Sequence, residues 1–432
     1  MAEILPIRAW RYGPELIKDI DSLVSPLFDV VSARQRQHLY QNPLNSIHLN
    51  VPEHLGPEGA AALLADWKSR GVIQQDHLYG IYVYYQYFRL HGSPDEYCRK
   101  GFIAHVRTYA WDDGVILRHE NTIPNAVNDR VELLGKTKLH ASPTHGLYTD
   151  PAFELEALMD LAIANPLCET EDYQGVRDVL AVIHDYEIVN RFIQFMADRK
   201  VILADGHHRY EGSLKYLEKS RAENPLHTGR EPYNYHLMYF TNTEAEDLVI
   251  LPTHRLVRNI VNWNEADFLK TLAQYFQIRE IDDIDNLNDV IAGKTWTFGL
   301  LLPGSGYRIT LKPEVFETMT WRFPEMIKRL DLTVLHYFII EKALGIPGRE
   351  QRTSPYISFD RSFSDCVQQV DSGRAQAAVI TNEVSIEDVK RVCESGYTLP
   401  QKSTYFYPKV VAGLMFSSIR EEEFVSAHFE PY

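Results

Sequence analysis

Residues 200–219, KVILADGHHRYEGSLKYLEK, bring a carboxylate, two imidazoles and a guanidinium together in one turn. A strand-like run ends at Asp205, Gly206 permits a sharp turn with positive φ, and a helical pattern begins at about His207. The free N–H groups and the positive dipole end of such a helix favour a phosphate or a carboxylate. We therefore predict an anion site at this turn.

The polar side chains of the turn can each contribute differently to binding a phosphate. Arg209 can donate two parallel hydrogen bonds to the anion, and His207 and His208 can donate to it as well. His208 can also transfer a proton near neutral pH. Asp205 beside an anion is unfavourable unless a cation separates them, and Mg²⁺ prefers carboxylate and phosphate oxygens. The turn is thus predicted to bind a nucleotide phosphate or a phosphate ester, with Asp205 as the metal ligand.

Two other interpretations of the turn remain open. Asp205 could be only the N-cap of the helix, with the histidines and Arg209 as ordinary surface or core groups. The residue types capable of binding zinc are Asp205, His207, His208 and Glu211. Adjacent histidines on a helix diverge by about 100°, however, and rarely reach one ion. We favour anion binding, because three donors in one turn are otherwise unexplained.

Two later segments carry further candidate ligands. ILPTHRLV places His254 and Arg255 at the end of an apolar strand, where they could bind an anionic substrate or simply be solvated. PQKSTYFYPK supplies Lys402, Ser403, Thr404 and Lys409. This segment lacks the glycines of a Walker motif, so it is either an anion clamp or a plain loop.

An earlier segment, RHENTIP, offers a candidate general base. It contains His119, Glu120 and Thr122, and a carboxylate or imidazole there could accept a proton or hold a metal. NDRVELL adds Asp129 and Arg130 as further polar groups. The chain has no Gly-x-Ser-x-Gly elbow and no Gly-x-Gly-x-x-Gly fingerprint, which argues against a serine hydrolase and a dinucleotide site.

The composition is that of a globular protein with a net negative charge. The 432 residues include 44 Lys and Arg against 59 Asp and Glu, a formal net charge of −15. An acidic chain repels polyanions, so we expect neither nucleic acid nor an anionic membrane as a partner. Four cysteines without zinc or redox spacing, and the lack of a signal-peptide pattern or a long apolar run, favour a cytoplasmic location. The oligomeric state is left open.

Alternating strand and helix patterns predict a mixed α/β, or α+β, fold in three segments. These are an N-terminal α/β segment over 1–150, a core with the DGHHR turn over 151–260, and a C-terminal α/β segment with the KSTYFYPK loop over 261–432. The Asp-Gly pair in WDDGV, residues 111–115, predicts a hairpin between two antiparallel strands.

Local patterns also predict helix ends and buried faces. Tyr210, Leu214 and Leu217 recur at helical spacing, which predicts that one face of the helix after the turn is buried. Asn264 and Ser385 are predicted N-caps of two later helices. A hairpin is predicted within residues 294–312, around the turn at 303–306.

The chain resembles the prokaryotic domain-of-unknown-function family 1015. The resemblance is carried by ADGHHRYE, LPTHRLV and LPQKSTYFYPKVVAGL, with IRAWRYGPELI…SPLFDVVS as the N-terminal signature and RHENTIPNAVNDRVELL as the middle one. It therefore runs nearly from end to end. The family typically has Pro-Pro-Tyr-Asp near its start. Here Pro26-Leu27-Phe28-Asp29 keeps the aspartate and lacks the tyrosine hydroxyl.

A second resemblance concerns the turn itself and about 60 residues around it. Residues 205–209 are similar to the phosphate-binding turn of the ParB/sulfiredoxin-like fold, which includes nucleotide-binding ParB proteins, sulfiredoxin and free-serine kinases. This implies a ParB/sulfiredoxin-like core, nucleotide phosphates at the turn, Mg²⁺ nearby and an upstream glutamate as base. Glu120 is the first candidate for that glutamate, and the others are Glu154, Glu156 and Glu169.

These patterns and resemblances lead to one functional hypothesis with two alternatives. The hypothesis is a phosphotransferase that uses Mg²⁺ with ATP or ADP and acts on a small hydroxy or phospho metabolite, with serine or phosphoserine implied by the family resemblance. Its catalytic residues would be Asp205, His208, Arg209 and Glu120. Phosphates would be bound by Gly206, His207, His208, Arg209, Lys402, Ser403 and Thr404, and the substrate by His254, Arg255 and Lys409. The alternatives are a phosphomonoester hydrolase at the same site and a non-catalytic, nucleotide-responsive regulator.

Overall fold

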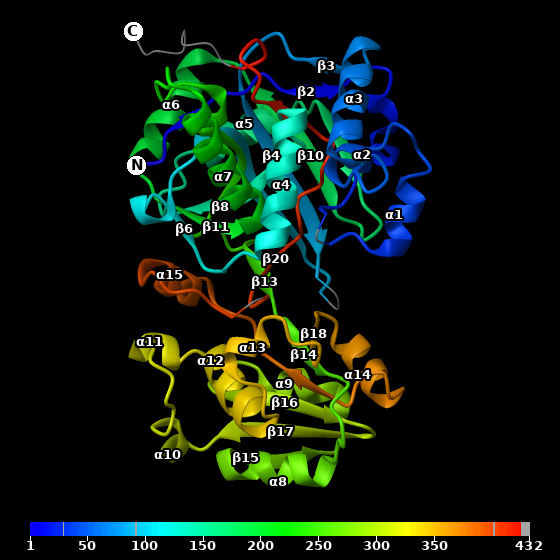
Figure 1. Cartoon of the computed structure of the whole chain (residues 1–432), viewed down its shortest axis with the longest axis vertical. Coiled ribbons are helices and arrows are strands. Elements are labelled where there is room, and N and C mark those ends of the chain that lie inside the picture. The colour runs from blue at the N-terminus through cyan, green and yellow to red at the C-terminus, as the bar shows by residue number, and fades with distance from the viewer. Residues whose placement is uncertain (29, 91–92, 401, 425–432) are drawn as a thin grey trace. The chain divides into compact units, whose positions relative to one another are not determined.

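The computed structural model describes residues 1–28, 30–90, 93–400 and 402–424, so Asp29 of the N-terminal signature lies outside the described residues. Helices and sheets are both present, which confirms the predicted α+β class (Figure 1). The chain forms two compact units. The first comprises Met1–Arg118, Thr122–Val249 and Pro408–Tyr432, and the second comprises His119–Asn121 and Ile250–Tyr407.

This division differs from the three consecutive segments that the sequence suggests. Position 150 lies inside the first unit, and the predicted boundary near 260 falls ten residues or so after the passage from Val249 to Ile250. The segment from Pro408 returns to the first unit after the whole second unit has been completed. Contacts between residues far apart in the sequence define the units, so local sequence patterns cannot reveal that the units are interleaved along the chain.

The main sheet of the first unit has the order β6-β11-β8-β12-β5-β4-β10-β9, with β1 paired to β5. The strands are β1 (Ile4–Leu5), β4 (Ile81–Arg89), β5 (Glu96–Arg107), β6 (Ile116–Arg118), β8 (Thr144–Tyr148), β9 (Cys168–Glu171), β10 (Arg177–Ile183), β11 (Val201–Asp205) and β12 (Tyr235–Asn242). β11 runs parallel to β6 and β12 runs parallel to β8, whereas the remaining pairs are antiparallel.

Both faces of this sheet are covered, so its strands are apolar on both sides. Along β4, Val83 and Tyr85 point into one core, and Tyr82 and Tyr84 point into the other, as the two-residue period of a strand requires. The first core also includes apolar residues of α5 (Glu156–Ile163), α6 (Tyr186–Ala197) and α7 (His207–Glu223). The second core includes residues of α3 (Gly56–Ser69) and of the chain after Pro408.

The remaining elements of the first unit are short, apart from α4 (Pro124–Thr137), which packs against α7 (Figure 1). They are β2 (Trp10–Tyr12), β3 (Ile73–Gln75), β7 (Leu139–His140), β21 (Ser417–Ser418), η1 (Ile17–Ser22), α1 (Ala33–Leu39), α2 (Ile47–Asn50), η2 (Trp111–Asp113) and η3 (Pro232–Asn234). β2 pairs with β3, and β21 pairs with β7.

The predicted hairpin at residues 111–115 is wrong, although its turn exists. Gly114 adopts the left-handed conformation at the end of η2, which is the backbone geometry that an Asp-Gly pair favours. The strand that follows, β6, pairs in parallel with β11 instead of folding back on β5. Pairing within the whole sheet has therefore overridden a correct local turn signal.

The second unit is built on an antiparallel sheet with the order β15-β17-β16-β19-β14-β18. Its strands are β14 (His254–Val257), β15 (Phe276–Ile281), β16 (Thr297–Leu302), β17 (Ser305–Leu311), β18 (Ile357–Asp360) and β19 (Ala377–Ile380). β16 and β17 form the hairpin that the sequence predicts. A separate pair joins β13 (Val249–Leu251) and β20 (Tyr405–Tyr407).

The helices of the second unit include both predicted caps. Asn264 accepts from the Asp267 amide at the start of α8 (Glu265–Tyr275), and Ser385 does the same for Asp388 in α15 (Ile386–Glu394). The others are η4 (Ile284–Asn286), α9 (Leu287–Ile291), α10 (Pro313–Phe316), α11 (Glu325–Lys328), α12 (Asp331–Val334), α13 (Gly348–Gln351), α14 (Phe363–Asp371) and the π-helix η5 (Leu335–Ala343). The sequence patterns gave no indication of this π-helix.

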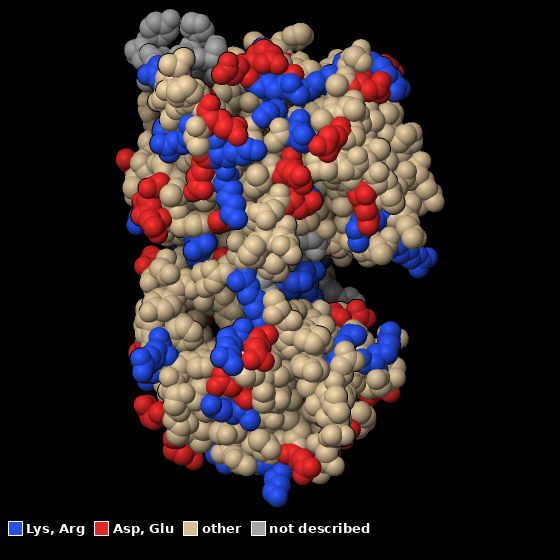
Figure 2. Space-filling view, in the orientation of Figure 1, with Lys and Arg blue, Asp and Glu red and all other residues tan. Residues whose placement is uncertain are grey.

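The surface carries both signs of charge. On the face shown in Figure 2, basic and acidic side chains are interspersed over the described residues. A search of the described residues found no helix with the length and apolar character that crossing a membrane requires.

Candidate functional site

The strand–turn–helix at 201–223 forms as the sequence predicts. β11 ends at Asp205, Gly206 has a φ of 88°, and α7 begins at His207. A Cβ atom at Gly206 would lie 2.6 Å from Cγ2 of Thr144 and 2.9 Å from Nη2 of Arg209. Only glycine therefore combines the positive φ with this close approach. The predicted burial of Tyr210, Leu214 and Leu217 on α7 is confirmed.

The carboxylate of Asp205 is held between two protein cations. Its Oδ2 accepts from Nη2 of Arg209 at 3.1 Å, and its Oδ1 pairs with the ammonium of Lys409. All three side chains are at least 87% buried. Burial alone would raise the pKa of Asp205, but the charges of Lys409 and Arg209 outweigh it, and the pKa lies well below its usual range. Asp205 is therefore ionised at neutral pH and is more than a helix cap.

Arg209 is fixed from a second direction as well. Its Nη1 donates to the Ser142 hydroxyl at 3.0 Å and to the Pro143 carbonyl at 2.6 Å. Both ends of the guanidinium thus engage the protein, so the double fork onto an anion that the sequence suggested is not available in this arrangement. Arg209 can still present its positive charge to a neighbouring cavity.

Lys409 is positioned by a buried polar network on the sheet. The Gln86 side-chain amide donates to the Lys409 carbonyl at 3.1 Å and to Oδ1 of Asp178 at 2.8 Å. Arg99 bonds to Gln86 and to the Pro408 carbonyl. Burial raises the pKa of Asp178 to about 7. Three central strands thereby hold the peptide at 408–409 in the register that places the Lys409 ammonium on Asp205.

A small polar cavity of about 50 Å³ lies beside Arg209 in the first unit. Its polar lining residues are Asn50, Arg130, His140, Ser142, Arg209, Ser213 and His236. Among the described lining residues none is acidic. The cavity is therefore lined by two permanent cations and several neutral donors, a composition that suits a small anion.

The two histidines of this cavity are neutral without a ligand. Burial, together with the charge of Arg209, lowers the pKa of His140 to about 4. Burial, followed by the charges of His140 and Arg209, holds the pKa of His236 well below its usual range. The His236 ring bonds to Ser213 through Nδ1 at 2.7 Å and to Thr144 through Nε2 at 3.0 Å. An anion in the cavity would offset part of the Arg209 charge and raise both pKa values.

The two histidines of the turn occupy different surroundings. His207 is buried at the start of α7. His208 is partly exposed, and its Nε2 accepts from the backbone amide of Ile123 at 3.0 Å. Nε2 therefore carries a lone pair in this arrangement, so His208 would have to release Ile123 before donating from that atom.

Other predicted site residues belong to the second unit. The Glu120 carboxylate accepts from the backbone amide of Lys402 at 3.3 Å, and His119 bonds to the Thr404 hydroxyl at 2.8 Å. Ser403 is buried and donates to the Pro400 carbonyl at 2.5 Å. Two predicted segments, RHENTIP and the KSTYFYPK loop, are thus brought together there.

His254 and Arg255 are buried rather than solvated at a strand end. His254 accepts the Thr381 amide at 3.2 Å through Nδ1, and burial lowers its pKa to about 4. Arg255 donates to the Thr253 carbonyl, and its Nη2 lies 3.5 Å from Nε2 of His336. They belong to the second unit and Asp205 to the first, so the two groups are placed on separate folded bodies.

The residues present do not form a protein-built metal centre. Among the described residues, no group of three or more histidine, cysteine or acidic side chains is arranged to hold a metal ion. Both oxygens of Asp205 already pair with protein cations. The zinc interpretation of the turn therefore has no support, and a metal on Asp205 would have to displace Lys409 or Arg209.

Several residues of the first-unit site have no motif in the sequence. Ser142, His140 and His236 lie in strands or between them and were not identified. Gln86 and Arg99 lie within long apolar strands whose two faces are buried. A polar residue in such a strand is the one sequence signal that could have indicated them, because burying it requires partners.

The fold and the site define a two-unit α+β protein with an ion-paired aspartate and a cation-lined cavity at a strand–turn–helix junction. The model of the family described as "Protein of unknown function (DUF1015)" matches residues 4–333. The chain therefore belongs to this family, as its motifs indicated. No curated protein matches the chain.

Solved structures resemble the chain only distantly. A free serine kinase in complex with AMP has a TM-score of 0.33 and 13% identity, covering 69% of this chain and 89% of its own. SbnI with a C-terminal truncation, from Staphylococcus aureus, has a TM-score of 0.34 and 12% identity, covering 73% and 87%. A conserved hypothetical protein from Pyrococcus furiosus has a TM-score of 0.33 and 14% identity, covering 69% and 92%. At these scores the similarity carries no functional argument.

Proposed function

We propose that the chain is a phosphotransferase of small-molecule metabolism, with the transferred phosphoryl group bound in the cavity of the first unit. One observation carries the proposal. The cavity is lined by Arg130 and Arg209 with no acidic residue among its described lining, and it lies beside an aspartate whose charge is already balanced. An incoming phosphoryl group would therefore meet positive charge without facing an uncompensated carboxylate.

The size of the cavity supports a phosphoryl group as its occupant. A volume of about 50 Å³ accommodates a few water molecules, and a tetrahedral phosphoryl group is of similar size. The serine hydroxyls of Ser142 and Ser213 and the imidazoles of His140 and His236 supply neutral hydrogen-bonding groups around it. The nucleoside and the acceptor molecule would extend outside the cavity.

The cation pair on Asp205 supplies the charge stabilisation that phosphoryl transfer needs. Arg209 lines the cavity and would neutralise charge on the equatorial oxygens, and Lys409 would offset the charge of Asp205, since catalysis of this reaction consists mainly of positioning and electrostatics. Asp205 acts as the positioning residue for both cations. Its strongly lowered pKa makes it a poor proton acceptor at neutral pH, so the general base is a different group. His208 stays a predicted proton donor, whereas the prediction of Glu120 as the base concerns the second unit.

The co-substrates in this proposal are a nucleotide, ATP or ADP, and a small metabolite with a hydroxyl or phosphate, serine or phosphoserine in the first instance. Mg²⁺ would accompany the nucleotide, because it usually binds through substrate phosphates with one or two carboxylates. The predicted roles of Lys402, Ser403 and Thr404 toward phosphates and of His254 toward the substrate concern the second unit and form no part of this proposal. Gly206 and His207 contribute backbone amides at the start of α7.

A phosphomonoester hydrolase at the same cavity is a second candidate function. The observation that favours it is the cavity size, which matches a phosphoryl group and leaves no enclosed space for a nucleoside. A hydrolase would release phosphate from phosphoserine with water alone.

The test is a phosphorus NMR assay on the full chain with Mg²⁺ and two substrate pairs, serine with ATP and phosphoserine with ADP. Wild type should transfer phosphate in at least one direction. Lys409→Met should lower kcat/KM by about 10²-fold, since it leaves Asp205 with one cation instead of two, and Arg130→Gln by about tenfold, since it removes a charge from the cavity wall. The control is Arg191→Gln, an exposed arginine of α6, which should keep wild-type activity.

Each result separates the candidates. Phosphate release from phosphoserine without nucleotide identifies the hydrolase. Full activity in Lys409→Met and Arg130→Gln would contradict the cavity assignment. No turnover with either pair, combined with nucleotide binding by calorimetry, would leave the nucleotide-responsive regulator.

A further inference from the structure

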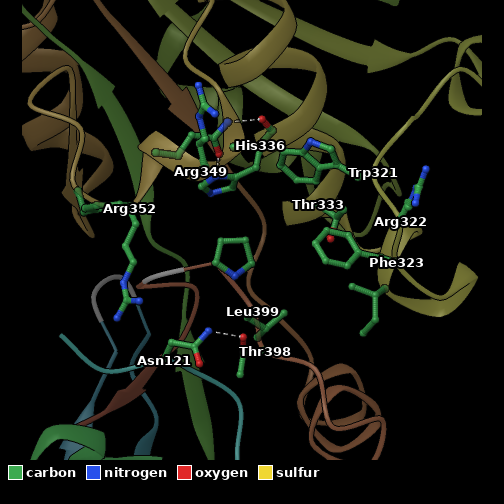
Figure 3. Close-up of a pocket in the computed structure, with 15 residues that line it drawn as sticks. Asn121, Trp321, Arg322, Phe323, Thr333, His336, Arg349, Arg352, Thr398 and Leu399 are labelled. Atoms are coloured by element: carbon green, nitrogen blue, oxygen red, sulfur yellow. Dashed lines mark hydrogen bonds between the residues drawn. The ribbon is translucent and has the colours of Figure 1, made fainter. Parts of the chain in front are cut away.

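The second unit contains a much larger cavity, of about 450 Å³, which the proposed phosphotransfer site does not use. It is lined from five separate stretches of the unit, namely residue 121, residues 321–336, residues 348–352, residue 359 and residues 398–400 (Figure 3). This volume lies in the range of 300–1,000 Å³ that is typical of small-molecule sites. The cavity is therefore large enough for a metabolite with a ring system.

The rim of this cavity is basic. Arg322 lines it from one segment and Arg349 and Arg352 from another, with Arg322 and Arg352 on opposite sides of the view in Figure 3. Among its described lining residues none is acidic. Two carboxylates pair with lining residues: Glu350 with Nε of Arg349 at 3.4 Å, and Glu341, which accepts from Trp321 and Gly348.

A buried arginine adds positive charge behind the wall. Arg255 is 1% exposed, and its Nη2 lies 3.5 Å from Nε2 of His336, which lines the cavity. Its other contacts are the Thr253 carbonyl and the face of Phe359, another lining residue, at 5.5 Å. Its Nε has no hydrogen-bond partner, and among the described residues no carboxylate pairs with it. A buried cation without a counter-ion is costly.

The imidazole of His336 is oriented to receive this charge. The Gln351 amide group donates to the His336 and Ile346 carbonyls, so its oxygen accepts from Nδ1 of His336, at 2.7 Å. Nε2 is therefore the unprotonated nitrogen that faces Arg255. Burial, together with the charge of Arg255, lowers the pKa of His336 to about 3. His336 is carried by the π-helix Leu335–Ala343, an uncommon element that occurs frequently at functional sites.

Aromatic rings form the rest of the wall. Trp321 and Phe323 pack edge to face, with centroids 5.7 Å apart, and Phe359 contributes a third ring. The ammonium of Lys402 lies 5.8 Å from the centre of the Phe359 ring. The predicted anion-clamp residue Lys402 is thereby at the edge of this cavity.

We propose that this cavity binds a small anion that carries a flat ring, such as a nucleoside monophosphate or an aryl carboxylate. The anionic group would lie toward Arg352, His336 and the buried charge of Arg255, and the ring against Trp321 and Phe323. The ligand would supply the counter-charge that Arg255 lacks, and a desolvated guanidinium site strengthens that attraction. This inference is independent of the proposed phosphotransfer, because it concerns a different unit and different residues.

The experiment is isothermal titration calorimetry on the full chain with AMP and with benzoate as probes. At least one of them should bind, whereas adenosine, which lacks the anion, and inorganic phosphate, which lacks the ring, should bind at least tenfold more weakly. Arg352→Gln should raise the Kd about tenfold, as the loss of one charge-assisted hydrogen bond does. Trp321→Ala should weaken binding by a similar factor through lost stacking. Arg374→Gln, an exposed arginine of the same unit outside the cavity, is the matched control and should leave the Kd unchanged.

Comparing AMP with benzoate shows whether the anionic group that the cavity binds is a phosphate or a carboxylate. The inference is overturned if neither AMP nor benzoate binds, if adenosine binds as tightly as AMP and benzoate is not bound, or if Arg352→Gln and Trp321→Ala leave the Kd unchanged. Repeating the titration in Arg130→Gln removes a contribution of the first-unit cavity. Binding that depends on Arg130 and not on Arg352 would assign AMP to the first unit and would equally contradict the inference.

Discussion

Arg209 in the first unit and Arg255 in the second are both buried, and they differ in how their charge is balanced. Arg209 in the first unit shares the carboxylate of Asp205 with Lys409 and donates to two further oxygens. Arg255 in the second unit is more deeply buried and has a carbonyl, an imidazole nitrogen and a ring as its neighbours. The first arrangement contains its own anion, whereas the second lacks one.

The difference indicates two uses of buried charge. The set formed by Asp205, Arg209 and Lys409 is held in place without a ligand, which suits side chains that must already be oriented when a phosphoryl group arrives. Arg255 is balanced only when an anion enters from the neighbouring cavity, which suits a site that responds to a ligand. The cost of burying Arg255 is then partly recovered on binding.

The largest loss of stability is expected when the carboxylate shared by Arg209 and Lys409 is removed. Asp205→Asn leaves Lys409 and Arg209 buried without a counter-ion, so we expect the free energy of unfolding to fall by about 3–5 kcal/mol. Urea denaturation followed by circular dichroism measures it. Asp198→Asn, at an exposed position after α6, is the control and should change it by less than about 0.5 kcal/mol. A loss as small as that of the control would show that the ion pairs contribute little to stability.

A second comparison sets the turn of the first unit against a turn of the second. Gly206 and Gly304 both have positive φ, 88° and 70°, but only Gly206 has neighbours that a Cβ would meet. Gly304→Ala should lower the free energy of unfolding by about 1 kcal/mol, through backbone strain alone. Gly206→Ala should lower it by about 2–3 kcal/mol, because the new Cβ would clash with Thr144 in addition to the backbone strain. Equal losses in the two variants would mean that the strand–turn–helix can shift to admit a methyl group.

The smallest expected effect is a pH dependence of the free energy of unfolding that comes from His336, beside Arg255 in the second unit. The folded-state pKa of His336 is lowered to about 3, so its neutral form stabilises the fold fully above the unfolded pKa of about 6.5 and less as pH falls below it. When the pH is lowered from 6 to 5, the free energy of unfolding of wild type should fall by about 1 kcal/mol more than that of His336→Gln. Urea denaturation at pH 7, 6 and 5 measures this, with the exposed His38→Gln as a control that keeps the wild-type slope. Identical slopes in wild type and His336→Gln would contradict the burial of a neutral imidazole there.

The sequence predicts the local part of the first site and misses the distant part. The strand ending at Asp205, the left-handed Gly206 and the helix from His207 all follow from residue type and spacing. Lys409 was identified as an anion ligand, but its pairing with Asp205 joins residues 204 positions apart, which no local pattern specifies. The same limit applies to Gln86 and Arg99, whose roles depend on strand order in the sheet.

The second site shows a different limit. His254 and Arg255 are predicted either to bind an anionic substrate or to be solvated at a strand end, and both are buried because β18 and β19 flank β14 on its two sides. Trp321, His336 and Arg352 come from a stretch without motifs, and the π-helix that carries His336 has the same apolar composition as an ordinary buried helix. Their convergence on one cavity follows from tertiary packing alone.

The central claim, that Arg209 carries its counter-ion and Arg255 awaits one, is tested most directly by the free energy of unfolding of Arg255→Met with and without AMP. Without AMP, the variant should be at least as stable as wild type, because a buried charge without a partner is removed. With AMP at about 100 times its Kd, the free energy of unfolding of wild type should rise by about 2.7 kcal/mol, and that of the variant should rise much less. A variant that unfolds several kcal/mol more easily without ligand, or that gains as much as wild type from AMP, would contradict the account.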